Sequence, residues 1–355
     1  MSSSNRRGES CAGCHGRRWF GIVLISVLLH LLLALPVSAQ TRLLKVATLA
    51  PDGSSWIAAM RDIDTEVREE TGGAVGLKIY PGGVQGGEGA MIRKMRIGQL
   101  HGGSFAGTGL SQMFADVLAL ETPFSFHNYD EVDYVLEQME DYYRRGFAQR
   151  GYAFMGWTDI GFVYLFSKRP IHGREDMKGM KVWRMQEDPI TGLIFERVGV
   201  NSVPLSIPDV LLGLQTNLVE VVYTSPAAAI VLQWFTRVKY ITDLPIAYAL
   251  GAFLLDQRAM DSLTDDQQRA LHDAARRHLK RQMEASRIDN RKALQVMADQ
   301  GLELVSPPED EIENFQILVR QVLPELLDTA FSRASFDLVQ SKLTEFRCRP
   351  IELQP

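Results

Sequence analysis

The stretch from Gly179 to Pro226 constrains the fold more than any other part of the chain, because strand and helix patterns alternate along it. Its short apolar runs are typical of buried strands, and each helical pattern starts beside an Asp-Pro or Pro-Asp pair. The expected elements are strands at 181–185, 202–205 and 219–223 and helices at 189–198 and 209–217. Five alternating elements in 48 residues predict an open parallel sheet with helices on its faces.

Sheets of this kind bind ligands beyond the carboxyl ends of their strands. Four residues of this stretch fall at such ends: Arg184, Ile207, Tyr223 and Ser225. We therefore expect a binding site to include them.

Residues 1–39 have the pattern of a cleaved export signal: four arginines, an apolar run at 20–35 and a small-residue motif at 37–39. The run is shorter than the ~20 residues that a membrane-spanning helix needs. The pair Arg17-Arg18 leaves both Sec and twin-arginine export open. Cys11 to His15 reads C-x-x-C-H, a haem-attachment pattern, but it precedes the apolar run and we expect it to be removed.

The chain that would remain, residues 40–355, is acidic. Loss of four basic residues and one acidic residue takes the formal net charge from −5 to −8. This balance argues against nucleic acid as a partner. Cys348 is its one cysteine, so no internal disulfide is expected and the fold must rest on its core.

The rest of the chain continues the α/β pattern. Alternating elements precede residue 107, and aromatic strand patterns at 153–166 and 239–255 are interpreted as crossings between two lobes. Thr264 to Gln267 forms a capping box, which opens a predicted helix to Gln300. Its apolar stripe is interpreted as core packing: Leu271, Ala275, Leu279 and Met283. Two amphipathic helices are expected at 309–331 and 335–346.

A search for catalytic chemistry finds no convincing group. The histidines do not have metal-ligand spacing, no serine lies in a G-x-S-x-G elbow, and the glycine-rich loop at 82–89 does not match a phosphate-binding motif. We expect no catalytic residue, no metal and no cofactor.

Two features favour a binding pocket. Arg184 in a strand could pair with a ligand carboxylate, although a surface arginine is an equal alternative. Aromatic residues near strand ends could form a pocket wall, with lobe core as the competing interpretation: Trp157, Phe162, Tyr164, Trp183 and Tyr223.

Several short motifs, in order and at fitting distances, carry a family resemblance. They are GGVQGGE (82–88), IGQLHG (97–102), TPFSF (122–126), DMKGMKV (176–182), VGVNSVP (198–204), LQTNLVE (214–220) and FTRVKY (235–240). With these motifs behind an export signal, the chain resembles the DctP-type periplasmic solute-binding subunits of TRAP transporters.

The resemblance implies a two-lobed, periplasmic binding protein-like (type II) α/β fold that closes by a hinge on a small organic solute, with a long helix spanning both lobes. The lobes would comprise residues 40–160 with 246–289, and 161–245 with 290–355. It also implies delivery of the solute to the small and large membrane subunits of the transporter. Some relatives pair through C-terminal helices, so a homodimer through the last two helices is a further expectation.

The chain departs from the family pattern where the ligand would bind. The family's clamping arginine falls at Trp183, and Arg184 comes one place later. Because one step along a strand reverses the side chain, either a bulge returns Arg184 to the cleft or Trp183 lines it instead. Ser225 falls where the family has an asparagine contact, Ile207 where an apolar residue covers the ligand, and Glu88 at an acidic rim position.

These departures move the expected pocket from charged toward aromatic. We therefore expect an exported solute receptor, not an enzyme, for an organic carboxylate or a more hydrophobic, aromatic solute. The alternatives are an extracytoplasmic ligand sensor and a hydrolase on the same α/β scaffold.

Overall fold

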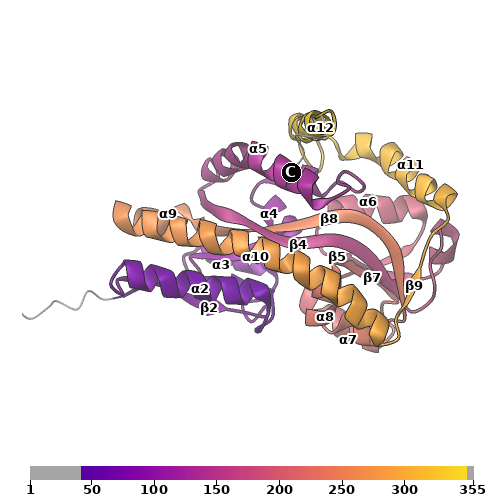
Figure 1. Cartoon of the computed structure of the whole chain (residues 1–355), viewed down its shortest axis with the longest axis horizontal. Coiled ribbons are helices and arrows are strands. Elements are labelled where there is room, and N and C mark those ends of the chain that lie inside the picture. The colour runs from indigo at the N-terminus through magenta and orange to yellow at the C-terminus, as the bar shows by residue number, and fades with distance from the viewer. Residues whose placement is uncertain (1–40, 350–355) are drawn as a thin grey trace, which may run out of the picture. The chain divides into compact units, whose positions relative to one another are not determined.

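The computed structural model describes residues 41–349, and the account below concerns the unit that begins at Arg42. The predicted export segment, with its cleavage motif, its arginine pair and the C-x-x-C-H pattern, lies outside the described residues. The fold is a mixed α/β architecture, with helices on both faces of a central sheet (Figure 1).

The strands pair in the order β2-β1-β3-β8-β4-β7-β5-β6, and β9 pairs with β8. β1 is parallel to β2 and β3, and β5 is parallel to β6 and β7, as the strand–helix alternation predicts. β8 is antiparallel to β3 and β4, and β4 is antiparallel to β7, which the alternation did not predict. The strand bounds are β1 (Arg42–Thr48), β2 (Val75–Tyr80), β3 (Gly102–Ala106), β4 (Tyr152–Ser167), β5 (Lys181–Met185), β6 (Asn201–Leu205), β7 (Val221–Thr224), β8 (Tyr240–Asp256) and β9 (Glu303–Val305).

The helices connect these strands and cover the sheet. The α-helices are α2 (Ser55–Glu70), α3 (Glu88–Arg96), α4 (Gly107–Ser111), α5 (Tyr129–Ala148), α6 (Pro189–Val198), α7 (Ile207–Gln215), α8 (Pro226–Val231), α9 (Gln257–Asp261), α10 (Asp265–Asp299), α11 (Glu309–Leu326) and α12 (Arg333–Arg347). Three short 3-10 helices are η1 (Ala115–Glu121), η2 (Arg174–Met177) and η3 (Trp234–Arg237).

The predicted alternation between residues 179 and 226 is confirmed as β5-α6-β6-α7-β7. α6 begins where expected because the Asp188 side chain caps it, accepting hydrogen bonds from the backbone N–H groups of Ile190 and Thr191. Pro189 is the first residue of α6, where proline removes no helical hydrogen bond. Local sequence signals thus determine this part of the fold.

The two long strands β4 and β8 join the two parts of the sheet, as the aromatic strand patterns predicted. We call the part with β1, β2 and β3 the first lobe and the part with β5, β6 and β7 the second lobe. The β4–β8 pairing shifts register at Phe154/Gly156, Asp159/Gly161 and Val163/Leu165. Such shifts bend a strand and interrupt its ladder, so the connection between the lobes is bent rather than flat.

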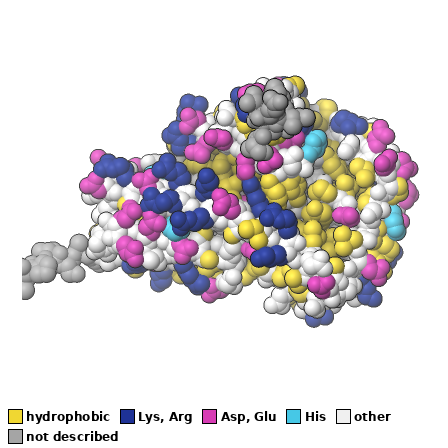
Figure 2. Space-filling model, in the orientation of Figure 1, with side chains coloured by type: hydrophobic (Ala, Val, Ile, Leu, Met, Phe, Trp, Pro, Cys, Tyr) yellow, Lys and Arg dark blue, Asp and Glu magenta, His cyan; other side chains and the backbone are white. Residues whose placement is uncertain are grey.

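The predicted long helix is confirmed as α10, which opens with the expected capping box at Thr264 and Gln267. α10 packs against α2 of the first lobe and α8 of the second (Figure 1). Its stripe is buried at Leu271, Ala275 and Leu279. Basic and acidic side chains cover the face of α10 that Figure 2 shows, whereas hydrophobic side chains gather to its right, where Figure 1 draws the bend of β8.

The last two helices pack on different elements of the fold. α11 contacts α6, while α12 contacts α5 and η1. In α12, Val339, Leu343 and Phe346 are buried, and Arg347 forms an ion pair with Glu131 of α5 at 2.8 Å. The apolar stripe of α12 is covered by α5, and the expected assignment of residues 290–355 to the second lobe stays a prediction. Pairing of two chains through these helices stays a prediction.

Candidate binding site

A cavity of about 270 Å³ lies between the lobes, and both contribute to its wall. It is near the lower end of the ~300–1,000 Å³ that is typical of small-molecule sites. The first lobe supplies residues that follow β1 and β3, among them Ala50, Pro51, Gly107 and Thr108. The second supplies residues in the carboxyl-terminal halves of β5 and β7, among them Trp183, Met185, Tyr223 and Thr224. The cavity thus occupies the carboxyl ends of the parallel strands, where such sheets bind ligands.

Trp183 faces this cavity and Arg184 does not. β5 pairs with β6 in unbroken register from Lys181 to Met185, so no bulge turns Arg184 inward. Trp183 is 2% exposed, and its indole Nε1 donates to the Leu205 carbonyl at 3.0 Å. Arg184 instead lines a separate surface pocket with Glu187, Asp188 and Glu196. The strand's alternation therefore decides between the two alternatives in favour of Trp183.

Tyr223 and Ile207 also line the cavity. The Tyr223 ring packs on Trp183 with a centroid distance of 4.8 Å. Its hydroxyl accepts from the Met185 backbone N–H at 3.2 Å and donates to Thr191 Oγ1 at 3.3 Å. Because its hydroxyl is already hydrogen-bonded within the protein, Tyr223 contributes mainly its ring to the cavity wall.

Four other residues expected in the site are not in the cavity wall: Ser225, Trp157, Phe162 and Tyr164. Ser225 is fully buried, and its hydroxyl caps α8 by accepting from Ala228 N. Trp157 packs against Tyr143 and Phe154 in the first-lobe core. The Phe162 ring packs against the rings of Tyr129 and Tyr248, with centroid distances of 5.0 and 5.5 Å. Trp157 and Phe162 therefore pack in the core, which was the alternative to a place in the pocket wall.

Carboxyl groups from both lobes line the cavity: Glu88, Glu121 and Asp188. Glu88 Oε1 accepts from Ala106 N at 2.6 Å, and burial raises the pKa of this side chain to about 7. Glu121 Oε1 accepts from Leu250 N at 3.0 Å, and burial raises its pKa to about 8. Burial also raises the pKa of Asp188, against the opposing effect of its hydrogen bonds from Thr191.

Sequence reasoning placed Glu88 at the rim and missed Glu121 and Asp188 as site residues. Glu121 directly precedes the TPFSF motif, and Asp188 was identified only as a helix start. Each residue lies beside a recognisable motif, but these motifs do not show that the two side chains face the same cavity.

Among residues 41–349, no lysine, arginine or histidine lines the cavity, and most of its wall is aliphatic or aromatic. The same residues contain no group of three histidine, cysteine, aspartate or glutamate side chains that could hold a metal ion. None of the described helices is both long enough and apolar enough to cross a membrane.

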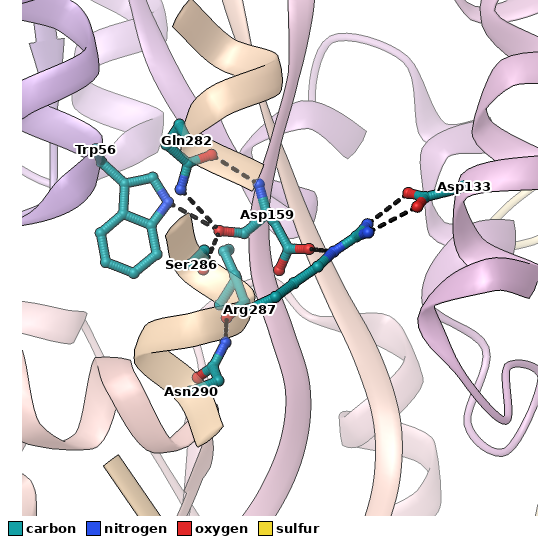
Figure 3. A network of polar contacts seen from close by, with 8 residues as sticks. Trp56, Asp133, Asp159, Gln282, Ser286, Arg287 and Asn290 are labelled. Atoms are coloured by element: carbon teal, nitrogen blue, oxygen red, sulfur yellow. Dashed lines mark hydrogen bonds and ion pairs between the residues drawn. The ribbon is translucent and has the colours of Figure 1, made fainter. Parts of the chain in front are cut away.

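A polar network fixes the bend of β4 to α10 at the Asp159 carbonyl (Figure 3). This oxygen accepts hydrogen bonds from Trp56 Nε1, Gln282 Nε2 and Ser286 Oγ at 3.0, 3.2 and 3.0 Å. Gln282 Oε1 in turn accepts from Asp159 N at 3.0 Å. The register shift at Asp159/Gly161 is thereby held against the long helix.

Asn290 and Arg287 extend this network (Figure 3). Asn290 donates to the Ile160 carbonyl at 3.0 Å and accepts from Ala227 N at 2.9 Å, so it joins β4, α10 and α8. Arg287 pairs with Asp159 at 2.9 Å and with Asp133 of α5. α10 therefore holds the connecting strand, α8 and α5 through polar contacts, of which those to β4 and α8 are the more buried.

Sequence comparison matches residues 46–329 to the DctP family, described as bacterial extracellular solute-binding protein, family 7. The chain is 26% identical over 234 residues to a solute-binding protein of Verminephrobacter eiseniae, an alignment that covers 64% of this chain and 68% of that protein. It is 24% identical over 262 residues to the 2,3-diketo-L-gulonate-binding periplasmic protein YiaO of Escherichia coli, covering 71% and 77% of the two chains.

Solved structures show the same fold. The sugar acid binding protein DctPAm of Advenella mimigardefordensis, in complex with galactonate, superposes with a TM-score of 0.81 at 18% identity, over 87% of this chain and 99% of that one. A TRAP periplasmic solute-binding protein of Haemophilus influenzae with bound L-gulonate superposes with a TM-score of 0.79 at 15% identity, over 85% of this chain and 99% of that one. The predicted two-lobed α/β fold is confirmed, and the chain belongs to the DctP family of bacterial extracellular solute-binding proteins.

Proposed function

We propose that this protein is the extracytoplasmic solute receptor of a TRAP-type secondary transporter. It binds a small organic solute between its lobes and delivers the solute, unaltered, to the small and large membrane subunits. One observation carries the proposal: a cavity at the carboxyl ends of the parallel strands takes its wall from both lobes. A solute in that position stabilises the closed arrangement of the lobes, which is the requirement for hinge closure.

Binding rather than catalysis is the function that this cavity supports. No histidine or cysteine of the described residues lines it, so its serine and threonine hydroxyls have no neighbouring imidazole base in the wall. The solved relatives are binding proteins in complex with galactonate and L-gulonate. A hydrolase on the same scaffold remains the alternative, and it predicts turnover of whichever solute stabilises the protein.

For this chain we propose Trp183, Tyr223, Ile207 and Glu88 as solute contacts, because all four line the cavity. The aromatic and aliphatic wall suits a solute with an apolar body, since burial of such surface contributes about 25 cal/mol per Å². The two solved relatives bind galactonate and L-gulonate, which are polar sugar acids. A mainly aliphatic and aromatic wall suits such polar ligands less well than a solute with an apolar body.

The place of action follows from the same proposal. Residues 1–39 direct export to the periplasm, through Sec or the twin-arginine route, and are then removed. The sensor alternative differs in the partner, which would be a membrane signalling protein rather than transporter subunits.

X-ray scattering of the exported protein against a metabolite panel tests the proposal. We expect at least one solute to reduce the radius of gyration and to be recovered chemically unchanged. If no solute compacts the protein while one is converted to product, the hydrolase alternative replaces the receptor. Reconstituted uptake with the membrane subunits distinguishes transport from sensing.

A further inference from the structure

We infer that the solute carries a cationic amino or ammonium nitrogen on an apolar body, and that Glu88 and Glu121 bind this nitrogen. The inference rests on the proposed function and specifies the chemistry of the same cavity. Asp188, on the facing lobe, adds a third carboxyl group to the wall.

Two glycines of α4 leave room for the carboxyl groups of these glutamates. A Cβ atom at Gly107 would overlap the Glu121 carboxyl group, and a Cβ atom at Gly109 would overlap that of Glu88. Only glycine at these positions of α4 therefore permits both carboxyl groups to lie against the helix. Burial is the main cause of the raised pKa of Glu121, and the charges of Asp188 and then Glu88 raise it further.

Both carboxyl groups keep unused capacity for hydrogen bonds. An ionised carboxylate has about four acceptor sites. Glu121 accepts only from Leu250 N among the described residues, and Glu88 accepts from backbone N–H groups of Ala106 and Gly109. Among the described residues neither has a basic side chain as partner, so when these carboxyl groups are ionised the protein supplies no cation for their buried charge.

A buried charge is unfavourable unless it is paired. A ligand nitrogen supplies the missing cation, and the aromatic residues of the same wall favour it further, because ring faces attract cations. Trp183, Tyr223 and Trp56 are three such aromatics in the wall. A ligand carboxylate would instead meet the ionised glutamates in a wall whose described residues include no lysine, arginine or histidine, and repulsion disfavours it there.

The competing possibility is an organic acid held by protonated carboxyl groups, and pH separates the two. The titratable groups that line the cavity are Glu88, Glu121, Asp188, Tyr223 and Tyr248. Just outside it, Arg184 acts on Asp188, and Asp159 with its partner Arg287 acts on Tyr248. Amine binding strengthens as pH rises and Glu88 and Glu121 lose their protons, whereas acid binding through protonated carboxyl groups weakens.

The experiment uses the exported protein and three carbon skeletons: hexyl, benzyl and 2-phenylethyl. Each is supplied as the primary amine, the carboxylate and the alcohol, and affinity is measured by calorimetry at pH 6 and pH 8.5. We expect amines to bind more tightly than the matched alcohols and carboxylates by about tenfold or more, and more tightly at pH 8.5. A carboxylate that binds more tightly than its amine, or three amines without measurable binding, overturns the inference.

Variants locate the site. Glu88→Gln and Glu121→Gln keep the side-chain size, and each is expected to weaken amine binding roughly 10- to 100-fold. Glu69→Gln removes the same charge from an exposed position of α2 and serves as the matched control. Unchanged amine affinity in both cavity variants, with folding intact by circular dichroism, also overturns it.

The two proposals fail separately. If a neutral or anionic metabolite compacts the protein and amines do not bind, the receptor function stands and the amine inference is wrong. If no metabolite or amine compacts the protein in X-ray scattering, the receptor function itself is wrong.

Discussion

At the scale of single residues, the buried carboxyl groups set how stability depends on pH. Glu88 has an ordinary pKa of 4.5 before folding and a pKa of about 7 in the fold. Below the lower value both states are protonated and the full stability is present. As pH rises toward the folded value, the unfolded chain releases its proton first, so the free energy of unfolding falls.

Glu88→Gln should remove this loss in the empty protein. Between pH 4 and pH 8 we expect the parent to lose about 3 kcal/mol of unfolding free energy that the variant retains, since the pKa rises from 4.5 to about 7 and one pKa unit corresponds to about 1.4 kcal/mol. Urea unfolding at both pH values measures the difference. Glu69→Gln should follow the parent, and parallel curves for parent and Glu88→Gln would show that Glu88 is ionised in the fold without penalty.

The neighbours Trp183 and Arg184 give a second prediction at this scale. Trp183→Ala empties part of the cavity wall and removes the hydrogen bond to Leu205, so we expect a loss of about 3–5 kcal/mol in unfolding free energy and of solute binding. Arg184→Ala, outside the cavity, should change solute affinity little. Urea unfolding and calorimetric titration measure both. Equal loss of binding in the two variants would contradict the position of Arg184.

At the scale of elements, the contacts between α10 and β4 hold the bend of the strand that connects the lobes. Asn290 is 5% exposed and joins the Ile160 carbonyl to the Ala227 N–H of α8. The capping box, the apolar stripe and the end of α10 follow from its own sequence. Its polar contacts to β4 do not, because they depend on which residues of a distant strand bend toward it.

Asn290→Ala should leave two buried backbone groups without partners. An unsatisfied buried group costs about 1–3 kcal/mol, so we expect a loss of roughly 2–4 kcal/mol and faster amide exchange around Asp159 to Gly161. Asn314→Ala, at an exposed position of α11, is the control and should be nearly neutral. Unchanged exchange in β4 would show that the network does not restrain the bend.

At the scale of the whole molecule, the glycine-rich loop after β2 approaches α7 of the second lobe. The side chain of Pro208 in α7 lies beside Gly83 in the glycine-rich loop of the first lobe. Val84 and Leu212, on the same two segments, are 69% and 61% exposed. These positions therefore accept labels without disturbing the core.

Spin labels on cysteines at Val84 and Leu212, in a Cys348→Ser background, should report closure. Cys348 is exposed and would otherwise compete for label. We expect addition of a bound solute to narrow the distance distribution and shift it to shorter values. A pair of labels at Glu69 and Glu137, both exposed in the first lobe, should not change. An identical distribution with and without solute would contradict hinge closure.

The sequence by itself determined the alternation of strands and helices, the caps at Asp188 and Thr264, the crossing strands and the family motifs, because these depend on neighbours within a few turns. Only the tertiary structure decided which side chains share the cavity. Glu121 and Asp188 lie 67 residues apart in sequence yet line one wall, and Arg184 is turned out by a single strand step. Local periodicity gives the alternation of side chains along a strand, but strand order and the choice of which face meets the cavity are set only by the tertiary structure.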